Sequence, residues 1–133
     1  MKYGEFIKHV QSFAQLNSHE DAERATRATL ETIKERIVGD EAKDLASQLP
    51  KELGEYLRGR EGENGQTFSI QEFISRVSEK EGVDPVSATT HARAVFEVLR
   101  NAVTPGEFKD FQANFSNDYA ELFPTSQESM ANG

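Results

Sequence analysis

Apolar residues recur along the chain at steps of three and four residues. One series ends at Leu57 and another at Phe123, with polar and charged residues between the apolar positions. Such steps place the apolar side chains on one face of a helix. No stretch shows the sustained alternation of a strand, so the pattern predicts an all-α protein. The two series are Leu30, Ile33, Ile37, Ala42, Leu45, Leu49, Leu53 and Leu57, and then Phe96, Leu99, Val103, Phe108, Phe111, Phe115, Tyr119 and Phe123.

Residues typical of helix starts divide this pattern into segments. Ser69 followed by Glu72 fits a capping box, and Asp84-Pro85 fits an N-cap followed by proline in the first turn. Thr104-Pro105-Gly106-Glu107 combines the two devices. Each half of the chain is therefore predicted to form a first helix, a long second helix and two short helices. The predicted ranges are 2–16, 19–38, 40–48 and 51–58, and then 70–81, 85–103, 105–114 and 117–123.

The two halves also match each other in sequence. Residues 25–57 align without gaps over residues 91–123 at an offset of 66, and seven of the 33 pairs are identical. Ordinary residue frequencies would give about two identities. The match predicts an internal duplication, which decides architecture but not chemistry. The identical pairs are Arg27/Arg93, Ala28/Ala94, Glu31/Glu97, Glu41/Glu107, Lys43/Lys109, Asp44/Asp110 and Glu55/Glu121.

The predicted organisation is a single compact domain over residues 1–124. Seven of the nine phenylalanines lie from Phe68 onward, and this aromatic surface needs a partner surface to cover it. We therefore expect a bundle of about eight helices whose halves pack on each other around a pseudo-twofold axis; an open array is the alternative. Repeat one spans about 2–58, an exposed linker 59–68, repeat two about 69–123, and a flexible tail 125–133.

Composition limits the range of functions. The formal charge is −8, with 15 basic and 23 acidic residues among 133. Nucleic-acid binding usually needs a basic surface, so we expect no nucleic-acid partner. The chain has no cysteine, and therefore no disulfide framework or thiolate site. No apolar run is long enough for membrane insertion, and the N-terminus lacks an apolar signal region. We expect a cytoplasmic protein.

The aligned segments resemble the bacterial family of uncharacterised proteins called DUF2267. The resemblance rests on RATLETIKERI-x-x-DEAKDLASQLPKELGEYL and on HARAVFEVLRNAVTPGEFKDF, and extends from about Phe6 to Phe123. It implies a small all-helical protein with a duplicated unit and no signal peptide, and it carries no catalytic motif to these residues. One departure is visible, since the second half has Phe115-Ser116 where the first has Leu49-Pro50.

Charged residues at matched positions suggest a repeated structural feature. Arg27 and Glu31 are four residues apart, hence neighbours on one helix face. We expect an ion-pair brace between the second and third helices of each half. Its residues are Arg27, Glu31 and Asp44, and then Arg93, Glu97 and Asp110. The alternative is an anion-binding site formed by Arg27 and Arg93, because arginine suits phosphate and carboxylate.

Catalytic and metal-binding patterns are not indicated. The three histidines, His9, His19 and His91, show neither the spacing of a zinc helix nor a paired carboxylate. Clustered acids at helix starts are explained by the helix dipole. We expect no metal, no cofactor and no catalytic residue, although a triad assembled in space is not excluded. A pocket holding His91 beside a buried carboxylate would revive an enzymatic interpretation.

The leading functional hypothesis is a non-enzymatic interaction module. It would bind a protein segment, or a second copy as a homodimer, through exposed apolar residues between its halves. The candidate contacts are Tyr3, Phe13, Tyr56 and Phe68. The alternative is a small-molecule or anion binder at the interface of the two repeats.

Overall fold

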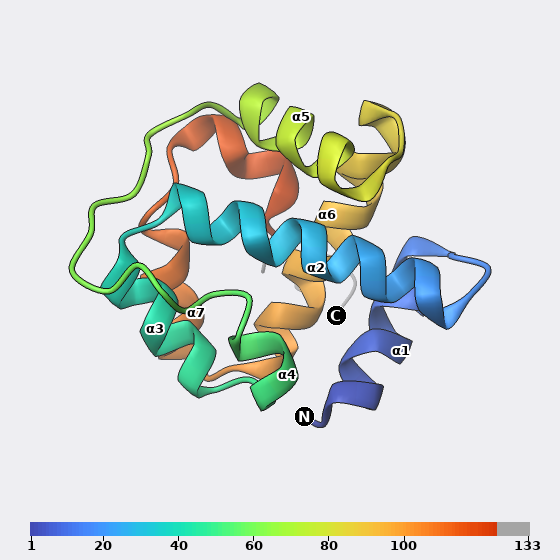
Figure 1. Ribbon diagram of the computed structural model, residues 1–133, viewed down its shortest axis with the longest axis horizontal. Coiled ribbons are helices and arrows are strands. Elements are labelled where there is room, and N and C mark those ends of the chain that lie inside the picture. The colour runs from blue at the N-terminus through green and yellow to red at the C-terminus, as the bar shows by residue number, and fades with distance from the viewer. Residues whose placement is uncertain (125–133) are drawn as a thin grey trace, which may run out of the picture.

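A computed structural model describes residues 1–124 of the chain, and within them it contains eight helices and no strand. The all-α prediction is thus confirmed, while the predicted tail lies outside the described residues. The helices are α1 (Tyr3–Ala14), α2 (His19–Arg36), α3 (Gly39–Ser47), α4 (Lys51–Gly54), α5 (Ile70–Glu81), α6 (Pro85–Ala102), α7 (Pro105–Gln112) and the 3₁₀ helix η1 (Asn117–Leu122) (Figure 1).

Local capping fixes where several helices begin. The side chains of Ser18, Ser69, Asp84 and Thr104 each accept a hydrogen bond from the backbone N–H three residues later. These N–H groups have no partner inside the helix, so a short polar side chain at the N-cap stabilises the first turn. Because this chemistry is local, the sequence predicted these four starts correctly.

Each half places its first helix against the long helix of the other half. α1 packs on α2 and on α6, and α5 packs on α6 and on α2, while α2 also contacts α6 and α3 contacts α7 (Figure 1). The bounds of α5 lie 67 residues after those of α1, and the bounds of α6 lie 66 residues after those of α2. Both halves therefore contribute to one core, and the rotation that would relate them stays a prediction.

Aromatic rings form the centre of the second half. The ring of Phe96 lies 5.0 Å from that of Phe123 and 5.5 Å from that of Phe111, both edge-to-face. Phe73 of α5 meets Tyr119 of η1 in the same manner at 5.6 Å. Edge-to-face pairs add to the stability gained by burying the rings. This cluster holds η1 against α5 and α6.

A buried arginine joins the end of α2 to the second half. Arg36 is 5% exposed. Its Nε donates to the carbonyl of Phe68 (2.9 Å) and lies 3.2 Å from the hydroxyl of Tyr119, and its Nη1 donates to the carbonyl of Asn114 (2.9 Å). The guanidinium also lies over the ring of Tyr119. The matched position in α6 is Ala102, so only one half makes this joint.

The segment that connects the halves makes specific contacts with the first half. Arg60 donates to the carbonyl of Glu35 (3.1 Å), and Gly39 donates to the carbonyl of Glu63 (2.9 Å). A Cβ atom on Gly39 would lie 1.6 Å from the carbonyl oxygen of Arg60. Most of the segment is exposed, as expected for a linker, but its backbone is fixed at these points.

Candidate functional site

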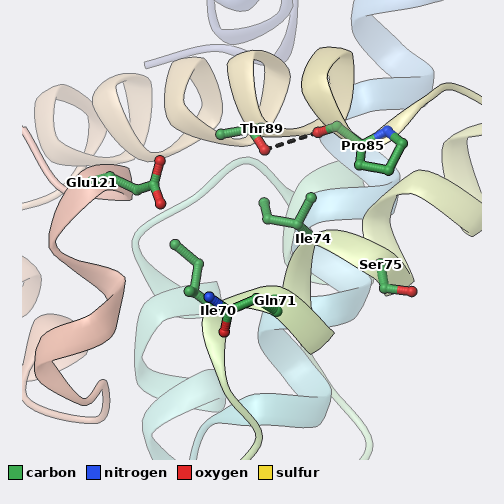
Figure 2. Close-up of a pocket in the computed structure, with 7 residues that line it drawn as sticks. All are labelled: Ile70, Gln71, Ile74, Ser75, Pro85, Thr89 and Glu121. Carbon is green, nitrogen blue, oxygen red and sulfur yellow. Dashed lines mark hydrogen bonds between the residues drawn. The ribbon is translucent and has the colours of Figure 1, made fainter.

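The first candidate site is a hollow between α5, α6 and η1, here called the α5–α6 hollow (Figure 2). Its volume is about 300 Å³. Figure 2 shows Ile70 and Ile74 projecting from α5 toward α6, with Glu121 of η1 at one end. The lining residues are Ile70, Gln71, Ile74, Ser75, Pro85, Thr89 and Glu121. The hollow therefore combines an apolar floor with a few polar groups, which is the usual composition of a small-molecule site.

Two polar groups at the edge of this hollow are held in place. The Thr89 hydroxyl donates to the carbonyl of Pro85 (2.8 Å; Figure 2), which leaves its oxygen lone pairs free to accept. Arg93, one turn further along α6, donates from Nε to the carbonyl of Glu121 (3.0 Å), and its Nη2 lies 3.9 Å from the Glu121 carboxylate. The hollow thus presents a hydroxyl acceptor from α6 and a carboxylate from η1.

A second candidate site lies where α1 meets the C-terminal part of α6, and we call it the α1–α6 hollow. It has a volume of about 140 Å³, and its lining residues are Met1, His9, Phe13, Val98 and Asn101. Phe13 is 53% exposed and Met1 is 41% exposed. The exposed ring of Phe13 and the exposed side chain of Met1 therefore lie together at the rim of this hollow.

A buried histidine–carboxylate pair joins α5 to α6. Nδ1 of His91 is hydrogen-bonded to Oε2 of Glu81, and both side chains are almost fully buried. The other carboxylate oxygen of Glu81, Oε1, has no hydrogen-bond partner among the described residues. Spacing along the chain does not predict this pair, although both residues fall on the buried faces of their helices. Neither residue lines the two hollows described above.

Four carboxylates gather where α3 packs on α7. Burial, and then the negative charges of Glu41, Asp44 and Asp110, raise the pKa of Glu107 to about 7. Burial together with Asp110 and Asp44 also raises the pKa of Glu41. The four acids occupy two matched pairs of positions, Glu41/Glu107 and Asp44/Asp110. Within residues 1–124, no group of three or more potential ligands has the geometry to hold a metal ion.

The structure brings together only one pair of the predicted brace. Nε of Arg27 lies 3.1 Å from the Glu31 carboxylate, and its guanidinium also lies over the ring of Tyr56. Arg93 instead meets Glu121, and Glu97 lies 3.6 Å from Arg100. Asp44 and Asp110 face the α3–α7 contact. A guanidinium reaches whichever acid the fold brings near, and η1 brings Glu121 to Arg93.

The predicted anion and partner residues have different environments. The side chains of Arg27 and Arg93 are more than half exposed, each already lies near a carboxylate, and neither lines the two hollows. Tyr3, Tyr56 and Phe68 are partly buried against the core. Tyr3 donates to the carboxylate of Glu23, and burial followed by this hydrogen bond raises the pKa of Tyr3. Among the four predicted contacts, Phe13 is the one that is mainly exposed.

The remaining histidines lie on the surface. His9 lines the α1–α6 hollow, and Nε2 of His19 lies 3.8 Å from the Glu23 carboxylate.

The helices described over residues 1–124 include none with the length and hydropathy of a membrane span.

Comparison with known proteins identifies the family. No curated protein matches the chain. The model of the family described as "Uncharacterized conserved protein (DUF2267)" matches residues 3–122 of the 133, which includes all eight helices described above. The resemblance noted in the sequence is thus confirmed, and the chain belongs to the DUF2267 family.

Proposed function

We propose that this protein is a non-enzymatic interaction module that binds a segment of a partner protein at the α1–α6 hollow. The observation that carries the proposal is the exposed ring of Phe13 beside a hollow lined from both halves of the chain. Leaving an aromatic ring in water is unfavourable, and covering it with a partner stabilises the complex. The first half supplies Phe13 and the second supplies Val98, so the site requires the assembled fold.

The size of the hollow determines what a partner would insert. A volume of about 140 Å³ suits one apolar side chain rather than a whole ligand. An amphipathic helix that places one anchoring side chain in a groove is the matching mode of recognition. Phe13 would then cover the inserted side chain, as aromatic residues at interface centres commonly do.

Charge favours a different protein over a second copy of this chain. Two copies would each bring a formal charge of −8 to the complex. Like charges oppose association, and a neutral or basic segment avoids this repulsion. We therefore commit to a partner segment that is apolar on one face and neutral or basic overall.

Site-specific photocrosslinking tests the proposal. A photoreactive amino acid replaces Phe13 in the source cell, and the control variant carries it at Val86, which is 79% exposed but remote from the hollow. We expect position 13 to give a specific adduct with one protein segment. A synthetic peptide of that segment should bind the purified chain, and Phe13→Ala should weaken binding at least tenfold, as for an interface hot spot, while Val86→Ala changes it less than twofold.

Two results would refute this function. The first is crosslinking of positions 13 and 86 to the same set of proteins, which would show that exposure alone determines the adducts. The second is crosslinking of position 13 only to a second copy of the chain, which would mean that the chain self-associates and binds no partner segment there.

A further inference from the structure

The α5–α6 hollow has a counterpart in the first half of the chain that is filled. α1 corresponds to α5 at an offset of 67, and α2 corresponds to α6 at an offset of 66. α4 and η1 also begin 66 residues apart, at Lys51 and Asn117. The elements that surround the hollow are therefore matched, one by one, by α1, α2 and α4.

In the first half, a tyrosine ring fills the matched place. Tyr3 begins α1, packs against the core and donates its hydroxyl hydrogen bond to Glu23 of α2. The raised pKa of Tyr3 has burial as its largest cause, and its other causes include Tyr56 and Glu52 near α4. A phenol ring thus occupies the space among the first helix, the long helix and the short helix of this half.

In the second half, the two residues that would fill this space are smaller. Ile70 stands where the first half has Tyr3, and Thr89 stands where it has Glu23. Isoleucine provides neither a ring nor a hydroxyl, and the threonine side chain is shorter than that of glutamate. Both residues line the hollow of about 300 Å³ (Figure 2). The space that a phenol ring takes in one half is therefore vacant in the other, and it reaches the lower limit of small-molecule sites.

The remaining polar groups suit a ligand that donates one hydrogen bond. The lone pairs of the Thr89 oxygen are available, since its hydrogen is donated to Pro85. The Glu121 carboxylate, which Arg93 approaches to 3.9 Å, is a second acceptor at the same hollow. Ile70, Ile74 and Pro85 offer apolar contact to a ring. An anionic ligand would meet the charge of Glu121, whereas a neutral hydroxyl would not.

We infer that the α5–α6 hollow binds a small neutral aromatic molecule with one ring and a hydroxyl group, which takes the place that Tyr3 takes in the first half. The ring packs on the two isoleucines, and the hydroxyl donates to the Thr89 oxygen. This inference is independent of the partner site at the α1–α6 hollow, because the two hollows share no residue and lie toward opposite ends of α6.

Titration with 4-methylphenol, which is the side chain of tyrosine as a free molecule, tests the inference. Backbone amide chemical shifts of the full chain are followed during the titration. We expect saturable changes at one site, centred on Ile70, Ile74, Thr89 and Glu121. Toluene has the same ring without the hydroxyl and should bind the unmodified chain about fivefold more weakly, because one neutral hydrogen bond is lost. For the same reason, 4-methylphenol should bind the Thr89→Val variant about fivefold more weakly than it binds the unmodified chain.

A double variant provides the matched control for the occupied space. Ile70→Tyr with Thr89→Glu copies the first half into the second, so its own phenol should fill the hollow and weaken binding more than tenfold. If this variant does not fold, Thr89→Val, which replaces the hydroxyl with a methyl group of similar shape, decides the question alone. The inference would be overturned by chemical-shift changes that do not saturate or that centre on Phe13. It would also be overturned by equal affinity for toluene and 4-methylphenol, or by full affinity of 4-methylphenol for Thr89→Val or for the folded double variant.

Discussion

Glu107 in α7 lies across the α3–α7 contact from Glu41 in α3, and the charge of Glu41 contributes to the raised pKa of Glu107. Both residues retain a buried carboxylate oxygen, Oε2, without a hydrogen-bond partner among residues 1–124. The two helices therefore meet through like charges at matched positions. Such an arrangement costs stability when both acids are ionised, and it makes the contact sensitive to pH.

The first prediction concerns the pH dependence of stability. The pKa of Glu107 is about 7 in the folded chain, against the ordinary value of 4.5 expected when unfolded. The folded state thus binds the proton more tightly, so the contribution of this group is fully present below pH 4.5 and is lost as pH rises to about 7. After discounting for solvent screening, we expect Glu107→Gln to stabilise the chain by about 1 kcal/mol at pH 7.5 and to have little effect at pH 4.

Urea denaturation at several pH values measures this difference. Glu79→Gln is the control, since it removes the same charge from an exposed position of α5. An equal effect of the two variants at pH 7.5 would mean that net charge, rather than the α3–α7 contact, controls the pH dependence.

The second prediction concerns the buried pair of His91 and Glu81. His91→Leu removes the partner of a buried carboxylate whose other oxygen is already unpaired. We expect a loss of about 3 kcal/mol in the free energy of unfolding, because the buried carboxyl group of Glu81 would lose its hydrogen-bond partner. The double variant Glu81→Leu/His91→Leu should lose less unfolding free energy than the two single variants lose in sum. We expect the difference to exceed about 1 kcal/mol. Additive losses in a double-mutant cycle would show that the two side chains are not coupled.

The third prediction concerns the approach of the linker to α3. Gly39→Ala would place a Cβ atom 1.6 Å from the carbonyl oxygen of Arg60, so the linker backbone must move. We expect a loss of about 2 kcal/mol, typical of overpacking at a site that cannot relax. Gly106→Ala in the first turn of α7 is the matched control, because nothing lies within 4 Å of its added methyl group. Thermal denaturation measures both variants, and we expect Gly106→Ala to change the midpoint only slightly. A similar fall of the midpoint in Gly39→Ala and Gly106→Ala would argue against a fixed linker.

The fourth prediction concerns the independence of the halves. Residues 67–124 alone lack α1 and α2, on which α6 and α5 pack. They also lose Arg36, which holds Phe68 and Asn114. We expect this fragment to show no cooperative thermal transition, because a unit of about 55 residues that has lost part of its core is near the lower limit for stability. A transition as sharp and as high as that of the whole chain would disprove the shared core.

The sequence by itself determined the helices and most of their starts. Steps of three and four between apolar residues depend only on the helical period, and caps such as Ser69 and Thr104 act on N–H groups three residues away. The range 70–81 was predicted without error, whereas 117–123 was predicted as a helix and is a 3₁₀ helix ending at Leu122. The family was also evident from the aligned segments.

Only the tertiary structure decided which side chains of different helices meet. Arg93 pairs with Glu121 rather than with Glu97, because η1 folds back onto α6. The pairing of His91 with Glu81, and the facing of Glu107 and Glu41, depend on how helices pack rather than on spacing in the chain. The α5–α6 hollow depends in the same way on three elements distant in sequence. Local periodicity fixes the faces of helices, but interhelical packing fixes contacts, and the candidate sites consist of contacts.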